Sequence, residues 1–156
     1  MSFVDGAIAL EELPPFLGDG GDRELHFARL ECLLRSSLDH VFIPEIVPEH
    51  DESGCVVGSK RREDSLRYAL DLRSSFGVSV VPYRVVSHRT RSENELWFRD
   101  VCDAGIDKVV IVGSFDKSPV SSVLRMNELA VSYGLNVGNI VIPTRRDEPD
   151  SVRAKV

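Results

Sequence analysis

The feature that most constrains the fold is a repeated alternation of short apolar runs with longer amphipathic stretches. Five runs are apolar almost throughout, which is typical of strands buried on both faces. They cover residues 7–10, 41–47, 78–86, 109–112 and 137–142. Their starts lie about 30–37 residues apart, the spacing that βαβ units need. The pattern predicts an α/β protein with a parallel sheet of about five βα units.

Apolar side chains at helical spacing fill the stretches between these runs. The four stripes are Leu25, Leu30, Leu33 and Leu34; Leu66, Ala69, Leu70 and Leu72; Leu96, Trp97, Val101 and Ala104; and Val123, Leu124, Leu129 and Ala130. Trp97 is expected in the core. Each of these stripes should therefore face the sheet from a helix.

Glycines and short polar motifs mark the expected helix ends. Gly77, Gly105 and Gly134 each stand just before the next strand, where a left-handed C-cap is favoured. Ser92 with Glu95 fits a capping box, and Ser118-Pro119 fits an N-cap followed by proline at the first helical position.

Composition narrows the class of protein. The 156 residues are enough for one domain, so residues 1–156 are expected to form a single domain. No apolar run reaches the roughly 20 residues that span a bilayer, and no signal pattern opens the chain, so we expect a cytoplasmic protein. The three widely spaced cysteines favour reduced thiols. A net charge of −6 argues against a nucleic-acid partner.

Several common kinds of site are excluded by their missing motifs. No GxGxxG follows the first strand and no P-loop is present, so the glycine cradles for dinucleotides and nucleotides are absent. The four histidines show no metal-ligand spacing, and no metal site is predicted. An open doubly wound sheet and a (β/α)8 barrel both stay possible, and both bind ligands beyond the carboxyl ends of the strands.

Charged residues gather at those predicted strand ends. The five exits read Glu11-Glu12, Pro44-Glu45, Pro82-Tyr83-Arg84, Gly113-Ser114-Phe115-Asp116 and Pro143-Thr144-Arg145-Arg146. The arginines could hold an anion and a carboxylate could transfer protons. The alternative is that these side chains simply solvate the rim. Lys60-Arg61-Arg62 is expected to open a solvated helix face.

Glu11 and Glu12 must point to opposite faces of their strand, because side chains alternate along a strand. Glu11 shares a face with Ala7 and Ala9, whereas Glu12 shares one with Ile8 and Leu10. Small residues suit a crowded barrel interior. This predicts that Glu11 faces the ligand site and that Glu12 faces solvent or a helix.

Four segments together resemble the methylenetetrahydrofolate reductase family, in order and at the family's spacings. They are IALEELPP, DHVFIPEI, GVSVVPYRVVSHRTRSENELWFRDVCDAGIDKVVIVGSFD and LNVGNIVIPTRRDEPDSVRAKV. The likeness is closer to the family's divergent branch than to the bacterial housekeeping enzyme. It implies an incomplete (β/α)8 TIM-type barrel made of the N-terminal five of eight units.

The resemblance also implies roles for individual residues. Glu11 matches the family's catalytic glutamate. The positions that match flavin contacts, and so would bind FAD, are Tyr83, Gly113, Ser114, Asp116, Arg146 and Lys155. Tyr83 and Arg146 stand where the family has histidines, and Gly-Ser-Phe-Asp replaces an Arg-Gly-Asp-like turn.

The implied function is that of a flavin-dependent oxidoreductase of one-carbon metabolism, or of a fragment of such an enzyme. It would reduce a folate-like methylene carrier to the methyl form, with NAD(P)H as a possible electron donor. The alternative is a non-catalytic partial-barrel subunit or assembly module, consistent with the short length and the altered turn. In either case a homo-oligomer or a complementing chain is expected to cover the open sheet edges.

Overall fold

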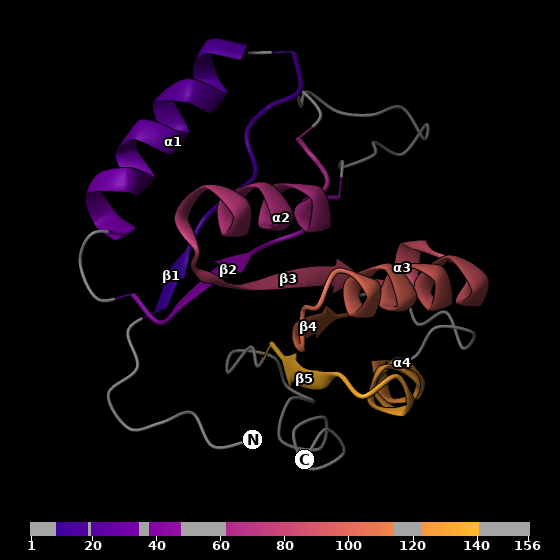
Figure 1. The fold of residues 1–156 in the computed structure, drawn as a ribbon. Coiled ribbons are helices and arrows are strands. Elements are labelled where there is room, and N and C mark those ends of the chain that lie inside the picture. The colour runs from indigo at the N-terminus through magenta and orange to yellow at the C-terminus, as the bar shows by residue number, and fades with distance from the viewer. Residues whose placement is uncertain (1–8, 19, 35–37, 48–61, 114–122, 141–156) are drawn as a thin grey trace, which may run out of the picture. The chain divides into compact units, whose positions relative to one another are not determined.

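The computed structural model describes residues 9–18, 20–34, 38–47, 62–113 and 123–140. Its elements in order are β1 (Ala9–Glu11), α1 (Gly20–Leu34), β2 (His40–Ile43), α2 (Ser65–Phe76), β3 (Ser79–Val85), the 3-10 turn η1 (Val86–His88), α3 (Arg91–Asp103), β4 (Lys108–Val112), α4 (Val123–Ser132) and β5 (Asn136–Asn139) (Figure 1). The chain divides into two compact units, Met1–Tyr83 and Arg84–Val156. Five strands alternate with helices, which confirms the predicted α/β fold and is consistent with a partial barrel.

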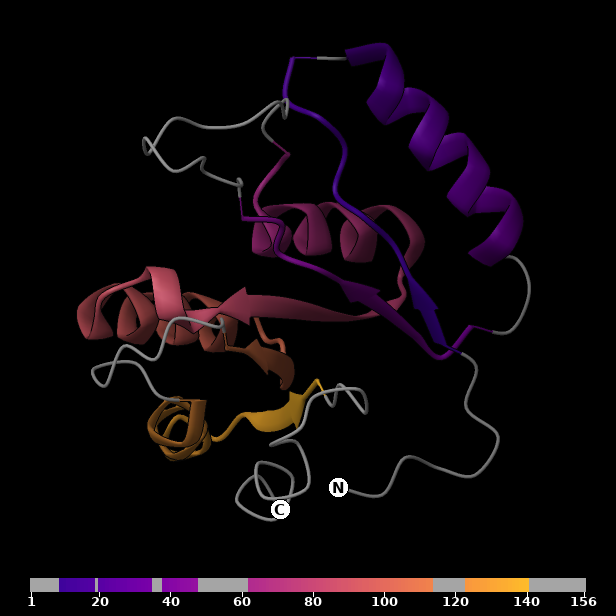
Figure 2. The ribbon, with the colours of Figure 1, turned by 180° about the vertical axis from the view of Figure 1, so that it is seen from behind.

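The first unit is a parallel sheet with its helices on one face. β1 pairs with β2 and β2 pairs with β3, both in parallel, and Glu11 lies level with Phe42. Because β1–α1–β2 and β2–α2–β3 are crossovers of the same hand in a sheet of order β1-β2-β3, both helices fall on the same side. Figure 2 shows β1 and β2 from the side opposite α2.

The core of the first unit lies between the helices and that face of the sheet. Val41 and Ile43 of β2 are fully buried, as is Tyr68 of α2. The Phe27 ring of α1 packs against Tyr68, with centroids 6.1 Å apart, and against Phe76, at 5.5 Å. These contacts fix α1 beside α2.

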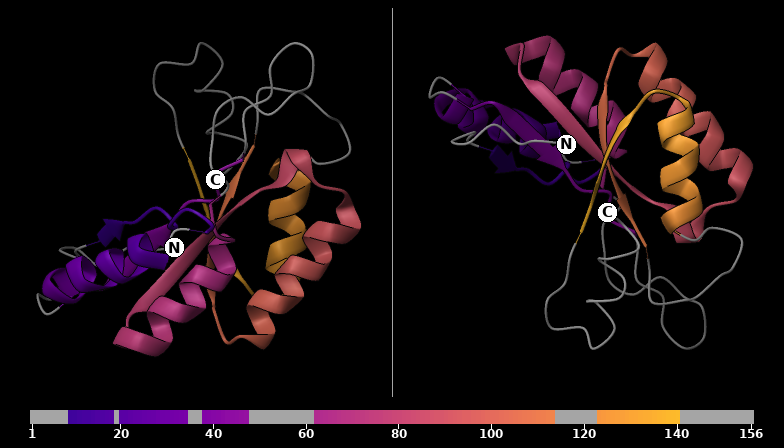
Figure 3. Two further views of the ribbon diagram at one scale, coloured as in Figure 1. Left: turned by 90° about the horizontal axis from the view of Figure 1, so that it is seen from above. Right: turned by 90° about the horizontal axis from the view of Figure 1, so that it is seen from below.

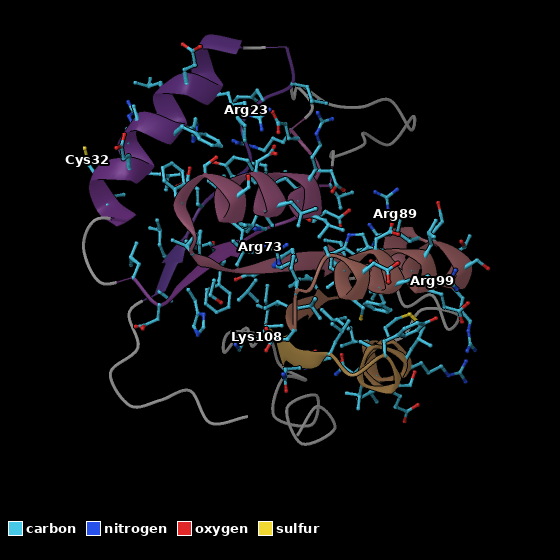
Figure 4. All side chains as sticks on the ribbon, in the orientation of Figure 1. Arg23, Cys32, Arg73, Arg89, Arg99 and Lys108 are labelled. Atoms are coloured by element: carbon cyan, nitrogen blue, oxygen red, sulfur yellow. The ribbon has the colours of Figure 1, made fainter. Side chains whose placement is uncertain are left out.

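An ion-pair cluster joins the same two helices at their surface. The Arg23 guanidinium of α1 contacts the carboxylates of Asp71 and, at 3.6 Å, Glu63 (Figure 4). Cys32 lies on α1 and points away from α2. It is an exposed free thiol.

The second unit pairs β4 with β5 in parallel, and α3 lies beside α4 (Figure 3). Phe98 and Val101 of α3 are fully buried, and so is Ala130 of α4. Trp97 is only 6% exposed, which confirms its predicted place in the core.

The predicted glycine caps are confirmed. Gly77, Gly105 and Gly134 have φ values of 68°, 70° and 83°, the left-handed region that suits glycine. The predicted capping box was wrong by two residues: the box of α3 is formed by Thr90 and Glu93, not by Ser92 and Glu95. Ser118-Pro119 lies outside the described residues.

The predicted helix stripes were too wide. Leu25 and Leu33 of α1 are 49% and 48% exposed, Leu96 of α3 is 55% exposed and Leu124 of α4 is 42% exposed. Adjacent helical residues diverge by about 100°, so Leu96 and Trp97 cannot both point at the sheet. Of these two side chains, Trp97 is the buried one.

β2 and β3 are shorter than the apolar runs that predicted them, whereas β4 begins one residue earlier, at Lys108. β2 ends at Ile43 because Pro44 has no N–H to donate to the ladder. Residues 7–8 and 141–142 of the predicted runs lie outside the described residues. None of the described helices is both long enough and apolar enough to cross a membrane.

Candidate active site at the end of the first strand

Glu11 and Tyr83 form a hydrogen-bonded pair on the face of the first unit's sheet that lies away from the helices. The Tyr83 hydroxyl donates to Glu11 Oε2 over 2.8 Å. The two residues come from the carboxyl ends of β1 and β3, so a contact separated by 72 positions in sequence is created by the parallel sheet. A carboxylate is thereby held at the edge where α/β proteins bind their ligands.

Three features of the local structure hold this pair in place. The Tyr83 ring packs edge-to-face on Phe42 of the intervening strand, with centroids 6.2 Å apart. The Ser65 hydroxyl, buried at the start of α2, donates to the Tyr83 carbonyl over 3.0 Å. The ladder continues past Glu11, because the Glu12 N–H donates to the Phe42 carbonyl over 2.8 Å. Both side chains of the pair are therefore positioned by regular structure.

The environment of the pair keeps Tyr83 protonated. Partial burial raises the pKa of the Tyr83 phenol well above its ordinary value, and the hydrogen bond to Glu11 and that carboxylate's charge raise it further. Tyr83 is thus a donor throughout the physiological range. It occupies one oxygen of Glu11, and among the described residues no donor contacts the other oxygen, Oε1.

Glu12 points to the opposite face, as the alternation predicted. Its Oε1 lies 2.7 Å from Nδ1 of His26 on α1. The two carboxylates therefore have separate surroundings, Glu11 beside Tyr83 and Glu12 against a helix. They do not form a carboxylate dyad.

A cavity of about 440 Å³ lies next to this strand end, between the β1 exit and α1. The ionisable residues of its lining are Glu11, Glu12, His26, Arg29 and Arg62. This cavity could not be predicted from the sequence, because its walls come from three separated segments.

Arg62 differs from its prediction as part of a solvated helix face. It precedes α2, which begins at Ser65, and its guanidinium lies 4.0 Å from the centroid of the Phe16 ring. It also donates to the Pro14 carbonyl over 2.6 Å. Phe16 and Arg62 also form an isolated antiparallel bridge, which joins the exit loop of β1 to the segment before α2.

Arg84 is also not the rim arginine that its position predicted. It is 6% exposed, its Nε donates to Asn94 Oδ1 over 3.1 Å, and its guanidinium lies 5.3 Å from the Trp97 ring. Asn94 in turn donates to the Val86 carbonyl over 3.3 Å. This arginine ties the end of β3 to α3 within the second unit.

The predicted flavin positions are only partly within the described residues. Ser114, Asp116, Arg146 and Lys155 lie outside them. Tyr83 is engaged by Glu11. Gly113 is required by packing, because a Cβ there would lie 2.6 Å from Cγ2 of Val123. Both described positions are thus accounted for by contacts within the chain, and they do not by themselves identify a flavin site.

Within the described part of the chain, no group of three or more His, Cys, Asp or Glu side chains could hold a metal ion. Cys102 is half-buried, with its thiol 3.5 Å from the Tyr133 carbonyl. Burial, together with the charge of Asp103, raises the pKa of this thiol. A thiol that is held protonated is a poor nucleophile, so Cys102 is assigned a structural rather than a catalytic role.

The fold is similar to that of a solved protein from Clostridium thermocellum, an uncharacterized protein that binds two copies of 5-methyl-5,6,7,8-tetrahydrofolic acid. The match has a TM-score of 0.68 at 19% identity and covers 96% of this chain and 50% of that one. The chain thus spans about half the length of the solved protein. No family model and no curated protein matches the sequence. The two proteins share a fold.

Proposed function

We propose that the first unit binds a reduced folate at the carboxyl end of β1, with Glu11 as the recognising carboxylate. The observation that carries the proposal is the Tyr83–Glu11 hydrogen bond of 2.8 Å, which fixes a carboxylate at the ligand-binding edge of the sheet. It is supported by the shared fold with a protein that binds a methylated tetrahydrofolate. Tyr83 occupies Oε2 of Glu11, so Oε1 is the oxygen that would accept one N–H of the reduced pterin, and a hydrogen bond to a carboxylate is a strong one.

The neighbouring aromatic ring suits the same ligand. Phe42 lies level with Glu11 on the adjacent strand and packs against Tyr83. A flat heterocycle that reaches Glu11 would therefore meet an aromatic side chain, and ring–ring contacts of this kind contribute about 0.5–1.5 kcal/mol beyond the buried area. Recognition would combine one charged acceptor with one aromatic wall.

The proposed reaction is the flavin-dependent reduction of a methylene-carrying folate to its methyl form. When bound and reduced by NAD(P)H, FAD would supply the hydride. Glu11 would hold and deliver the proton that the folate nitrogen takes up. Closure of a ligand over the pair would desolvate the carboxyl, and burial favours the protonated form of a carboxyl.

Calorimetric titration with 5-methyltetrahydrofolate tests the binding proposal. Glu11→Gln should weaken binding by about tenfold to a hundredfold, because it removes a charge-assisted hydrogen bond. Glu12→Gln is the matched control, since that carboxylate contacts His26 on the other face. Equal affinities for the wild type and Glu11→Gln would refute the role of Glu11, and no saturable binding would refute the proposal itself.

A visible spectrum of the purified protein with added FAD tests the reaction separately. The flavin proposal fails without binding at micromolar FAD. If FAD binds, Glu11→Gln should lower folate-directed turnover by about 10²-fold, the scale for a general acid, and leave reduction of the flavin by NAD(P)H intact.

A second candidate, a non-catalytic partial-barrel subunit, is favoured by the edge of the first unit. β1 is the edge strand of the sheet, and Leu25 and Leu33 of the adjoining helix are about half exposed. We propose that a second copy or a complementing chain covers this edge. Light scattering should then show a species larger than the monomer, whereas a monomer at tens of micromolar would refute the homo-oligomer.

A further inference from the structure

The cavity beside β1 is lined by side chains of both charges. The carboxylates come from β1 and its exit, through Glu11 and Glu12, whereas the arginines come from elsewhere. Arg29 lies on α1, and Arg62 lies on the segment that pairs with the exit loop. A ligand in the cavity would therefore meet both carboxylate acceptors and cationic donors.

The two arginines of the cavity differ from two other arginines of the chain in their partners. Arg23 contacts two carboxylates, and Arg91 pairs with Glu95 over 2.8 Å. In the described part of the chain, neither Arg29 nor Arg62 contacts a carboxylate. Arg62 uses one N–H for the Pro14 carbonyl, which leaves further donors of its planar fork for an anion.

The remaining walls of the cavity are apolar. They are formed by Leu13, Phe16, Leu30 and Leu33. Leu13 and Leu33 are 39% and 48% exposed, so a ligand there would cover apolar surface that water now contacts. A volume of about 440 Å³ lies within the usual range for small-molecule sites. An apolar body that ends in a carboxylate matches this combination of walls and arginines.

Glu11 connects the cavity to the proposed ligand site. The residue lines the cavity and also accepts the hydrogen bond from Tyr83. A molecule that reaches Glu11 with one end can therefore extend its other end past the strand terminus into the cavity.

We infer that this cavity is a subsite for the aryl-glutamate tail of the folate, an inference that rests on the proposed function. The aromatic part of the tail would contact Phe16 and the leucines. Its carboxylates would be held by Arg29 and Arg62. The charge of Glu12, which would repel such a tail, is turned toward His26 at 2.7 Å.

The test compares 5-methyltetrahydrofolate with 5-methyltetrahydropterin, which has the same ring system without the tail. The wild type should bind the tailed ligand more tightly, by tenfold or more. Arg29→Gln should reduce this ratio about tenfold, because it removes a charge-assisted contact. The matched control is Arg99→Gln, which removes the same charge from an exposed position on α3 (Figure 4).

Arg62→Gln should also reduce the ratio of the two affinities. Because the Arg62 guanidinium also packs on Phe16 and bonds the Pro14 carbonyl, thermal unfolding of this variant checks that the protein stays folded without these contacts. Equal affinity for the two ligands would overturn the subsite and leave the Glu11 site standing. A ratio that neither arginine variant changes would likewise overturn the subsite and leave the Glu11 site standing.

If neither ligand binds, the proposed function has failed, and free p-aminobenzoylglutamate tests the cavity alone. Amide chemical-shift changes around Phe16 and Leu33 that are lost in Arg29→Gln would support the subsite as an aryl-carboxylate site. No shifts at millimolar concentration would overturn it.

Discussion

The Tyr83–Glu11 hydrogen bond gives the sharpest prediction about the site, because it joins two strands at the point where chemistry is proposed. The oxygens lie 2.8 Å apart, a normal length for a strong O–H···O bond. A hydrogen bond to a charged group contributes about 1.5–3 kcal/mol when buried. Glu11 is exposed, so solvent screening brings the expected coupling down to about 1 kcal/mol.

A double-mutant cycle measures this coupling. Urea unfolding of the wild type, Glu11→Ala, Tyr83→Phe and the double variant gives the interaction free energy directly. A coupling within about 0.3 kcal/mol of zero would show that the pair does not hold the strand ends together. Glu12→Ala with Tyr83→Phe is the control cycle and should show no coupling, because Glu12 points to the other face.

Alkaline titration provides an independent readout of the same pair. The pKa of Tyr83 is raised in the folded protein, so the folded state keeps its proton when the unfolded chain has lost it. The resulting stability is complete below the unfolded pKa of about 10 and falls as pH rises toward the raised value. Tyrosinate absorbance should show Tyr83 ionising earlier in Glu11→Ala, but still late, because burial is the largest cause. An unchanged titration would contradict the contact.

Three further predictions concern stability. Gly113→Ala should destabilise the protein by about 1–3 kcal/mol, because the new Cβ would overlap Val123; thermal unfolding measures it. Hydrogen bonds from the backbone and the hydroxyl of Thr90, the N-cap of α3, lower the pKa of Glu93. Glu93 therefore stabilises the fold above its unfolded pKa, and this stabilisation is lost as pH falls through the lowered value. Acid unfolding of Glu93→Gln should lack this loss. Arg84→Met should cost about 2 kcal/mol by leaving the buried Asn94 oxygen without its donor, as measured by urea unfolding followed through tryptophan fluorescence.

The features predicted correctly from sequence are those set by local geometry. A left-handed glycine before a strand depends on a few neighbouring residues, and Gly77, Gly105 and Gly134 all adopt it. The opposite facing of Glu11 and Glu12 depends only on the alternation of side chains along a strand. The apolar runs identified all five strands because a parallel sheet must be covered on its faces whatever its ligand.

The wrong predictions concern features for which the sequence offers more than one candidate residue or environment. Thr90–Glu93 and Ser92–Glu95 both have the spacing of a capping box, and the choice depends on where the chain leaves η1 rather than on the residue types. Arg84 reads as a rim charge because arginine is seldom buried, but Asn94 and Trp97 provide an acceptor and a ring face for its guanidinium. These partners of Arg84 are ten or more positions away in sequence, and only the packing of α3 brings them to the guanidinium.

The candidate site shows the same division between local and non-local information. The face and strand end of Glu11 follow from four neighbouring residues, but its partner Tyr83 is 72 positions away and its cavity also includes α1 and Arg62. These contacts require the parallel register of β1, β2 and β3, which places Glu11 level with Phe42 and within reach of Tyr83. A register shifted by one residue would turn Glu11 toward α1 and place Glu12 beside Tyr83. The chemistry proposed for Glu11 therefore depends on the pairing of β1 with β2, in which Glu11 lies level with Phe42.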